Sequence, residues 1–275
     1  MRSAPSLGLL LLILLATSAR ATGITAPGVN LAWDQCFGDG GTHNKTFACD
    51  VNTGSDRLVA SFELGSDLPG VTGLEMYLDV RSTSSTVPAW WAFNAPGGVI
   101  GCRGSALLAS ATMPPGSVNC ADWAGGLAAG GLAAYRIGSF YGPSNARVIT
   151  GFAVAEPLDL VGGQEYFAMT LNLSHTKTVG TGACGGCDIP VCIFLQRINV
   201  VPGTARSVML DRGANYSGSQ YVRWQNGYPT NITPICEQLC SSPSGGLPAD
   251  LFDCVLATPT SSRTSTWGQV KSLYR

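Results

Sequence analysis

The residues with the clearest chemical potential are cysteines, three of which fall within the stretch ACGGCDIPVC (183–192). Cys184, Cys187 and Cys192 could belong to a metal-binding knuckle, a redox-active dithiol or a disulfide framework. A zinc site needs four ligands, and His175 would have to supply the fourth, because the sequence has no second Cys-x-x-Cys motif. A redox dithiol normally lies at the N-terminus of a helix, whereas this motif precedes a proline and a strand-like segment.

The N-terminus favours the disulfide interpretation, because it has the features of a secretory signal. Arg2 precedes the apolar stretch LGLLLLILLA (7–16), and Ala19-Arg20-Ala21 has the small-x-small pattern that signal peptidase cleaves. The apolar run is too short for a membrane-spanning helix, which needs about 20 residues. We therefore expect a signal peptide at 1–21. The mature protein should be secreted, extracellular or at the cell surface, with the periplasm as the alternative compartment, and should not span a membrane.

The chain has ten cysteines, an even number, which an exported protein usually pairs as disulfides. They form four groups along the sequence: Cys36 and Cys49; Cys102 and Cys120; Cys184, Cys187 and Cys192; Cys236, Cys240 and Cys254. The sequence does not determine their connectivity. If each of the first two groups closes on itself, the two trios must share at least one disulfide, because three cysteines cannot all pair among themselves. The cluster at 184–192 is then a clasp to a C-terminal extension.

The charge of the chain argues against some classes of partner. Its formal net charge is −1, and loss of Arg2 and Arg20 with the signal peptide makes it about −3. Nucleic-acid-binding proteins usually carry a basic excess, and a polybasic patch for an anionic membrane surface is also missing from the sequence. The expected partner is an extracellular or cell-surface glycan or protein.

The strongest structural signal is a period-two alternation of apolar and polar residues, which is typical of half-buried strands. It occurs in the segments 57–64, 71–80, 146–154, 165–173, 192–201 and 220–225, which Gly-, Pro- and Asn-rich turns separate. Many strands without alternating helices predict an all-β fold, an antiparallel β-sandwich that is jelly-roll-like and stapled by disulfides.

We expect this sandwich domain to occupy residues 22–235, followed by a disulfide-tethered C-terminal extension and tail at 236–275. A short terminal helix would place Trp267, Val270 and Tyr274 on one face. The alternative is that the tail is a sorting or attachment element, since it follows a linker rich in Ser, Thr and Pro.

Motifs for catalysis are absent from the sequence. It contains two histidines and neither a G-x-S-x-G nor an H-E-x-x-H motif, so we assign no catalytic residue and lean against an enzyme. Asp50, Asn52 and Asp56 follow the spacing of positions 1, 3 and 7 of a calcium-binding loop. Gly54 and Ser61 stand where that loop needs acidic residues. A turn rich in Asp and Asn is the favoured interpretation, so we expect no cofactor and keep calcium as the alternative.

Aromatic residues form a further candidate surface. Trp90 and Trp91 are adjacent, so on a strand they would face opposite sides and one would be exposed. An exposed tryptophan can stack on the apolar face of a sugar. Trp224 and Tyr221 are additional candidates. The alternative is that these side chains fill the core, as most large aromatic side chains do.

The opening LAWDQC (31–36), the stretch CGGCDIPVCIFL (184–195) and the ending TWGQVKSLYR (266–275) resemble exported, uncharacterised bacterial proteins predicted to be β-sandwiches. This resemblance implies an exported sandwich with a Thr-Trp-Gly…Tyr-Arg tail and transfers no functional residue. The leading hypothesis is a secreted, non-enzymatic structural or adhesive protein. The alternatives are a carbohydrate-binding module that uses an exposed tryptophan, and a glycan-active hydrolase whose carboxylate pair the sequence does not identify.

Overall fold

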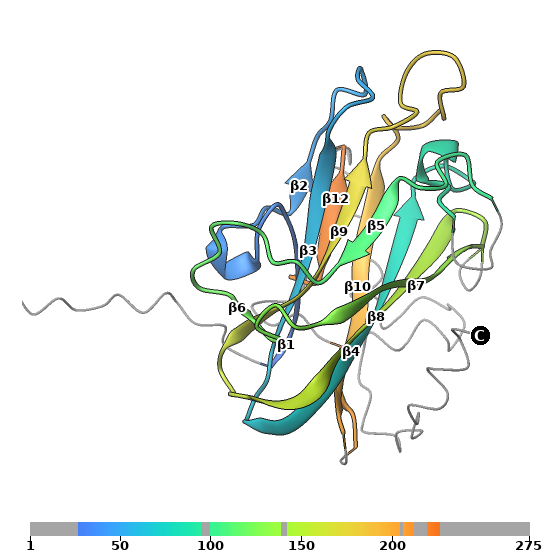
Figure 1. The fold of residues 1–275 in the computed structure, drawn as a ribbon. Coiled ribbons are helices and arrows are strands. Elements are labelled where there is room, and N and C mark those ends of the chain that lie inside the picture. Colours follow the sequence, from blue (N-terminus) through green and yellow to red (C-terminus); the bar gives the residue numbers. More distant parts are fainter. Residues whose placement is uncertain (1–26, 95–99, 139–141, 204–205, 212–218, 226–275) are drawn as a thin grey trace, which may run out of the picture.

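The computed structural model describes residues 27–94, 100–138, 142–203, 206–211 and 219–225, which form two β-sheets packed face to face (Figure 1). Sheet A contains β1 (Gly28–Trp33), β3 (Ser55–Glu63), β5 (Leu107–Ser110), β6 (Ala121–Asp122) and β9 (Glu165–Ser174). Sheet B contains β2 (Asn44–Lys45), β4 (Leu68–Ser82), β7 (Ala129–Ile137), β8 (Asn145–Leu160), β10 (Val191–Pro202), β11 (Val208–Leu210) and β12 (Tyr221–Trp224). Two short 3-10 helices, η1 (Phe37–Asp39) and η2 (Ala89–Trp91), lie in the connections.

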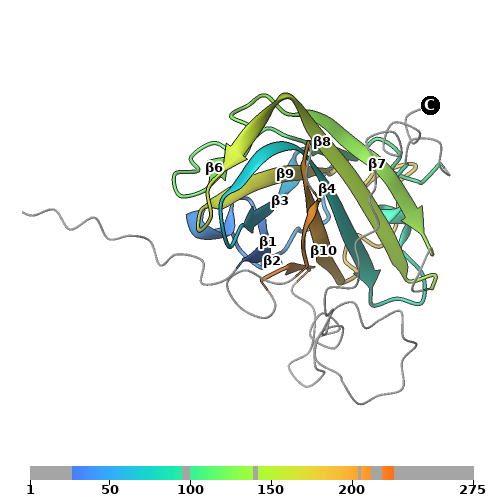
Figure 2. The ribbon, with the colours of Figure 1, turned by 90° about the horizontal axis from the view of Figure 1, so that it is seen from below.

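The strand order shows that the chain passes repeatedly between the two sheets, as from β3 to β4 and from β8 to β9. Sheet A has the order β1-β3-β9-β5 with β6 beside β9, and sheet B has the order β2-β12-β10-β4-β8-β7 with β11 beside β10. The long pairs β3–β9 and β10–β4 are antiparallel, whereas the two short pairs β2–β12 and β6–β9 are parallel. Figure 2 shows the two layers curling around a shared interior. The predicted antiparallel β-sandwich is confirmed.

Period-two alternation explains which side of each strand faces the interior. On β4, the residues Leu74, Met76, Leu78 and Val80 all belong to the buried core. The alternation on β10 is interrupted, because the register against β4 shifts between Leu195 and Arg197. This β-bulge moves the next core residue of β10 to Ile198, so the strand keeps its apolar face inward along its full length.

Three disulfides connect distant loops of the sandwich. Cys36 pairs with Cys120, Cys49 with Cys187, and Cys102 with Cys184. The local pairing of Cys36 with Cys49 and of Cys102 with Cys120 is therefore wrong, because the antiparallel fold brings together loops that are far apart in the sequence. A disulfide that closes a loop of this length stabilises the folded state by about 4 to 5 kcal/mol in the chain-entropy model. Disulfides of this kind indicate an oxidising, extracytoplasmic environment.

Several expectations lie outside the described residues. These are the signal peptide at 1–21, the boundary near residue 235, the extension and tail at 236–275, and the cysteines Cys236, Cys240 and Cys254. In the part of the chain that the structure describes, no helix has the length and apolar character needed to cross a bilayer.

The interior position of Leu78 allows a test of the packing. Its side chain is 0% exposed between Val148 on β8 and Leu195 on β10. We expect Leu78→Ala to lower the free energy of unfolding by about 2 to 5 kcal/mol, because it removes buried methyl groups and leaves a cavity. The matched control is Leu108→Ala, since Leu108 is 63% exposed, and it should change stability by less than about 0.5 kcal/mol. Denaturant unfolding with the disulfides intact measures both values. Equal losses in the two variants would contradict this placement of the core.

Candidate functional site

Three long loops meet at one end of the sandwich and form the candidate site. They are the described parts of the connections at 46–54, 83–106 and 175–190, which lie at the top of Figure 1 and which we call the loop end. Cys49–Cys187 joins the first loop to the third, and Cys102–Cys184 joins the second to the third. The third loop, which contains the CGGC motif, is thus covalently fixed to both of the others.

Asn52 holds the first loop against the third by hydrogen bonds to the main chain. Its Oδ1 accepts from the backbone N–H groups of Thr178 at 2.7 Å and Val179 at 3.0 Å, and its Nδ2 donates to the Val179 carbonyl at 3.0 Å. Asn52 was one of the three candidate calcium ligands. Because its amide is committed to the neighbouring loop, its oxygen is not directed at a cation.

Asp56, a second candidate calcium ligand, belongs to a chain of charged groups at the base of the loop end. Its carboxylate lies 2.8 Å from His175 Nε2 and 3.2 Å from Lys45 Nζ, which also pairs with Asp34 at 2.9 Å. The other ring nitrogen of His175 lies 2.9 Å from the Thr53 carbonyl. Both ring nitrogens of His175 therefore face oxygen atoms.

Two of the three candidate calcium ligands, Asn52 and Asp56, already bond to other groups of the protein. Asp50 is exposed, whereas Asp56 is buried, where it forms an ion pair with Lys45 and a hydrogen bond with His175. Among the described residues, the group of His, Cys, Asp and Glu side chains that lies close enough to hold a metal is a different one, discussed below. The turn at 50–56 is thus held to the neighbouring elements by Asn52 and Asp56, and the calcium site stays a prediction.

Arg103 ties the second loop to the third from inside the core. Its side chain is 1% exposed, and its guanidinium carbon lies 3.5 Å from the ring centroid of Trp90. Nη1 donates to the Trp90 carbonyl at 2.9 Å, and Nε donates to the Thr176 carbonyl at 3.0 Å. Burial lowers the pKa of Arg103 to about 10. Sequence reasoning missed this residue, because one arginine next to a cysteine in an apolar loop carries no recognisable motif.

The three candidate tryptophans, all within the described part of the chain, do not form an exposed platform. Trp90 and Trp91 lie on the 3-10 helix η2 rather than on a strand, and both are buried, at 0% and 1% exposure. Trp224 is also 0% exposed, stacks on Trp90 with 5.0 Å between ring centroids, and donates from Nε1 to the Cys187 carbonyl. The expectation that one tryptophan of the 90–91 pair is exposed is therefore wrong. Tyr221, which is half-buried, is the candidate with a partly accessible ring.

A pair of buried carboxylates lies on the outer side of sheet A, away from the loop end. Glu63 on β3 and Glu165 on β9 are partners in the strand register and are 4% and 6% exposed. Burial, together with the charge of Glu165, raises the pKa of Glu63 to about 7. Burial also raises the pKa of Glu165, although hydrogen bonds from Ser61 and from two backbone N–H groups oppose this shift. The sequence did not identify this pair, because register decides which acids meet across two strands.

Glu165 anchors the segment that covers the outer side of sheet A. Its two carboxylate oxygens accept hydrogen bonds from the backbone N–H groups of Phe37 at 3.2 Å and Gly38 at 2.8 Å. A Cβ at residue 38 would lie 2.5 Å from Glu165 Oε2, so a larger residue there would displace this carboxylate from its present position. Asp39 in turn accepts from the backbone N–H groups of Val118, Asn119 and Cys120. The carboxylates of Glu165 and Asp39 therefore hold η1 in place by hydrogen bonds to the main chain.

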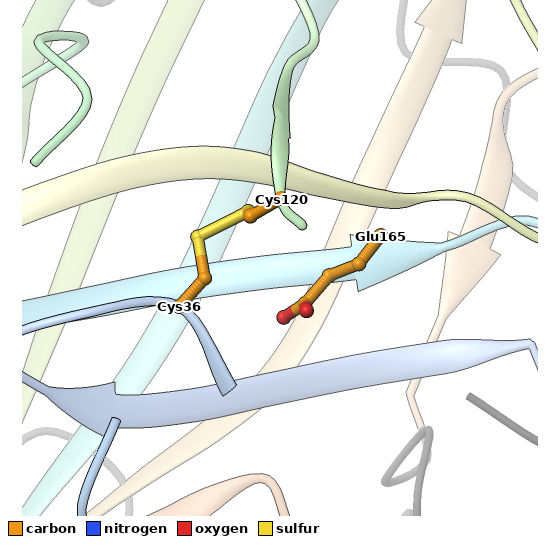
Figure 3. Close-up of side chains that lie close together, drawn as sticks. All are labelled: Cys36, Cys120 and Glu165. Atoms are coloured by element: carbon orange, nitrogen blue, oxygen red, sulfur yellow. A yellow bond between two sulfur atoms is a disulfide. The ribbon is translucent and has the colours of Figure 1, made fainter. Parts of the chain in front are cut away.

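Figure 3 shows Glu165 beside the Cys36–Cys120 disulfide. One atom from each of these three side chains lies within 4.8 Å of the others, which is close enough for a shared metal ion. The two sulfur atoms are bonded to each other, however, so neither is a thiolate ligand. The disulfide fastens η1 to the segment at 113–120, and the hydrogen bonds of Glu165 hold η1 against β9.

No family model matches the chain, and no curated protein shows significant sequence similarity to it. Function must therefore be argued from the described residues themselves. The two arrangements found, the loop end and the fastening on sheet A, both immobilise loops.

Glu63 predicts a specific dependence of stability on pH. The folded state holds the proton of Glu63 up to about pH 7, whereas the unfolded chain releases it near 4.5, so stability falls as pH rises through this window. We expect Glu63→Gln to raise the free energy of unfolding above that of the original chain by about 1 to 2 kcal/mol at pH 8, a value reduced for solvent screening. At pH 4, where Glu63 is protonated in both states, the two proteins should have almost the same free energy of unfolding. Urea unfolding across this pH range measures the difference. Glu156→Gln, at an exposed position on β8, is the control and should show no such trend. A constant difference between pH 4 and pH 8 for Glu63→Gln would contradict the argument.

The contacts of Arg103 predict that stability depends on the shape of its guanidinium group and not only on its charge. Lysine cannot reproduce the fork that bonds the Trp90 and Thr176 carbonyls while lying flat on the indole. We expect Arg103→Lys to cost about 1 to 3 kcal/mol of stability. Arg136→Lys, at an exposed position on β7, should cost less than about 0.5 kcal/mol. Denaturant unfolding distinguishes the two, and an unaffected Arg103→Lys protein would show that the fork is dispensable.

Proposed function

We propose that the protein is a secreted, non-enzymatic adhesive module that binds an extracellular protein or glycan through its loop end. The observation that carries this proposal is that two disulfides fix three loops at one exposed end of the sandwich. Binding sites are often built from loops on a rigid scaffold. Loops that are already ordered lose less conformational entropy when they bind, so their rigidity raises the affinity that a given contact surface can provide.

The loop end also carries exposed apolar side chains that suit a contact surface. Val51 in the first loop is 41% exposed, and Ile100 in the second is 84% exposed. The third loop presents small residues at 180–183, which allow close approach of a partner to the backbone. Aliphatic side chains surrounded by small and polar residues favour a protein surface, whereas sugar stacking would require an accessible aromatic ring.

The two other hypotheses have weaker support. A carbohydrate-binding module would have to use Tyr221 on the outer face of sheet B, since Trp90, Trp91 and Trp224 are buried. A glycan hydrolase would have to use Glu63 and Glu165. Both Glu165 oxygens already accept hydrogen bonds from the chain, so this carboxylate is poorly placed to act on a substrate.

Substitutions at the loop end test the proposal. Val51→Asp and Ile100→Asp should each weaken binding at least tenfold, because a charge replaces an apolar contact. The matched control is Val161→Asp, since Val161 is 58% exposed in the β8–β9 turn at the other end of the sandwich. Binding of the purified protein to arrays of extracellular proteins and of glycans is the measurement. Circular dichroism should show the same fold in all three variants.

Each outcome of this experiment discriminates among the hypotheses. Binding to a protein that is lost in Val51→Asp and Ile100→Asp but kept in Val161→Asp supports adhesion through the loop end. Glycan binding that survives both loop substitutions and is lost in Tyr221→Ala would favour the carbohydrate-binding module instead. Turnover of a glycan that disappears in Glu63→Gln would establish the hydrolase and overturn the proposal.

A further inference from the structure

The outer face of sheet B has a cysteine whose disulfide partner lies elsewhere in the chain. Cys192 on β10 is disulfide-bonded. The six other cysteines among the described residues pair with one another, so they cannot supply its partner. The cysteines that remain in the sequence are Cys236, Cys240 and Cys254, all in the segment that follows sheet B.

The direction of Cys192 follows from the alternation on β10. Val191, Ile193 and Leu195 belong to the core between the sheets, so Cys192 and Phe194 point to the opposite, outer face. Both are nevertheless only 1% exposed, and neither belongs to a hydrophobic cluster of the described residues. A large aromatic side chain that is outward-facing and yet buried must be covered.

Other groups on the outer face of sheet B also indicate that another segment covers it. The Nε atoms of Arg197 and Arg223 are buried and have no hydrogen-bond partner among the described residues. The strand register places Arg81 on β4 and Arg223 on β12 on either side of Cys192. In the next outward row, Phe194 lies between Asp79 and Tyr221. Two arginines thus flank Cys192, and the acid of the next row, Asp79, is already paired with Arg147.

The C-terminal segment has complementary chemistry. Residues 236–256 read CEQLCSSPSGGLPADLFDCVL, which contains acidic and apolar residues but no Lys or Arg. The described chain ends at Gln225, immediately after the strand that pairs with β10 beside Cys192. The chain that leads to the segment therefore leaves the described part of the structure beside this face.

We propose that residues 236–256 of this chain dock on the outer face of sheet B, tethered by a disulfide between Cys192 and one of Cys236, Cys240 and Cys254. The acidic side chains of the segment face the arginines around Cys192, and its leucines and Phe252 cover Phe194. Because one cysteine of the trio pairs with Cys192, the other two pair with each other. The segment is a third layer of the fold, and it leaves the loop end free.

Disulfide mapping of the full-length exported protein tests the tether. Digestion without reduction, followed by mass spectrometry, should give a peptide that joins Cys192 to the region 236–254, together with a second disulfide within that region. A free thiol at Cys192, or a bridge from Cys192 to any other cysteine, would overturn the proposal. A Cys192 bridge between two chains, seen as a dimer that reduction dissociates, would also overturn it and would identify a second copy as the cover.

Charge reversal tests the docking while the disulfides remain intact. Arg223→Glu should speed chymotryptic cleavage within 236–256 at least fivefold, because it repels the acidic segment. The matched control, Arg136→Glu, changes an exposed arginine on β7 at the far edge of sheet B and should leave the cleavage rate unchanged. Equal rates in the original chain and both variants would show that the segment does not lie on this face. The binding assays of the loop end do not bear on either result.

Discussion

The packing of Trp90 is the interaction on which the rest of the structure depends. Its ring contacts the Arg103 guanidinium at 3.5 Å and stacks on Trp224 of β12. Its backbone N–H donates to the Gly185 carbonyl, and its indole N–H donates to Thr178 Oγ1. One side chain therefore connects η2, sheet B and the third loop of the loop end. A buried cation without a carboxylate partner is costly, and the aromatic face with two carbonyls offsets part of that cost.

Polar side chains in this protein mostly hold loops in place. Asn52 and Asp39 each accept hydrogen bonds from successive backbone N–H groups of another loop, and Glu165 does the same for η1. This arrangement satisfies donors that no strand pairs, so long connections can remain ordered without forming helices or strands. It also explains how a chain with only 12% charged residues fixes so many loops, because a few carboxylates and amides are buried where they bond several donors each.

The strands could be predicted from the sequence, whereas the site could not. The alternation at 71–80 identified β4, because the period of two depends on neighbouring residues alone. The burial of Trp90 and Trp91 was missed because they lie on a 3-10 helix, where adjacent side chains need not face opposite sides. The pairs Cys49–Cys187 and Glu63–Glu165 depend on which loops and which strand registers the fold brings together. No local pattern contains that information.

The connections at the two ends of the sandwich differ in how far they depend on disulfides. At the β8–β9 turn, a short connection carries the chain from sheet B to sheet A, and hydrogen bonds such as Gly162 to Asp67 close it. At the loop end, the connections are long, and the entropy of ordering them grows with every residue. Hydrophobic packing holds only part of these loops, such as Trp90 and Trp91, and the two disulfides fix parts that lie outside the core. Four cysteines hold the loop end in one shape, which the packing of the core alone does not require. The simplest explanation is that a fixed shape at this end was itself selected.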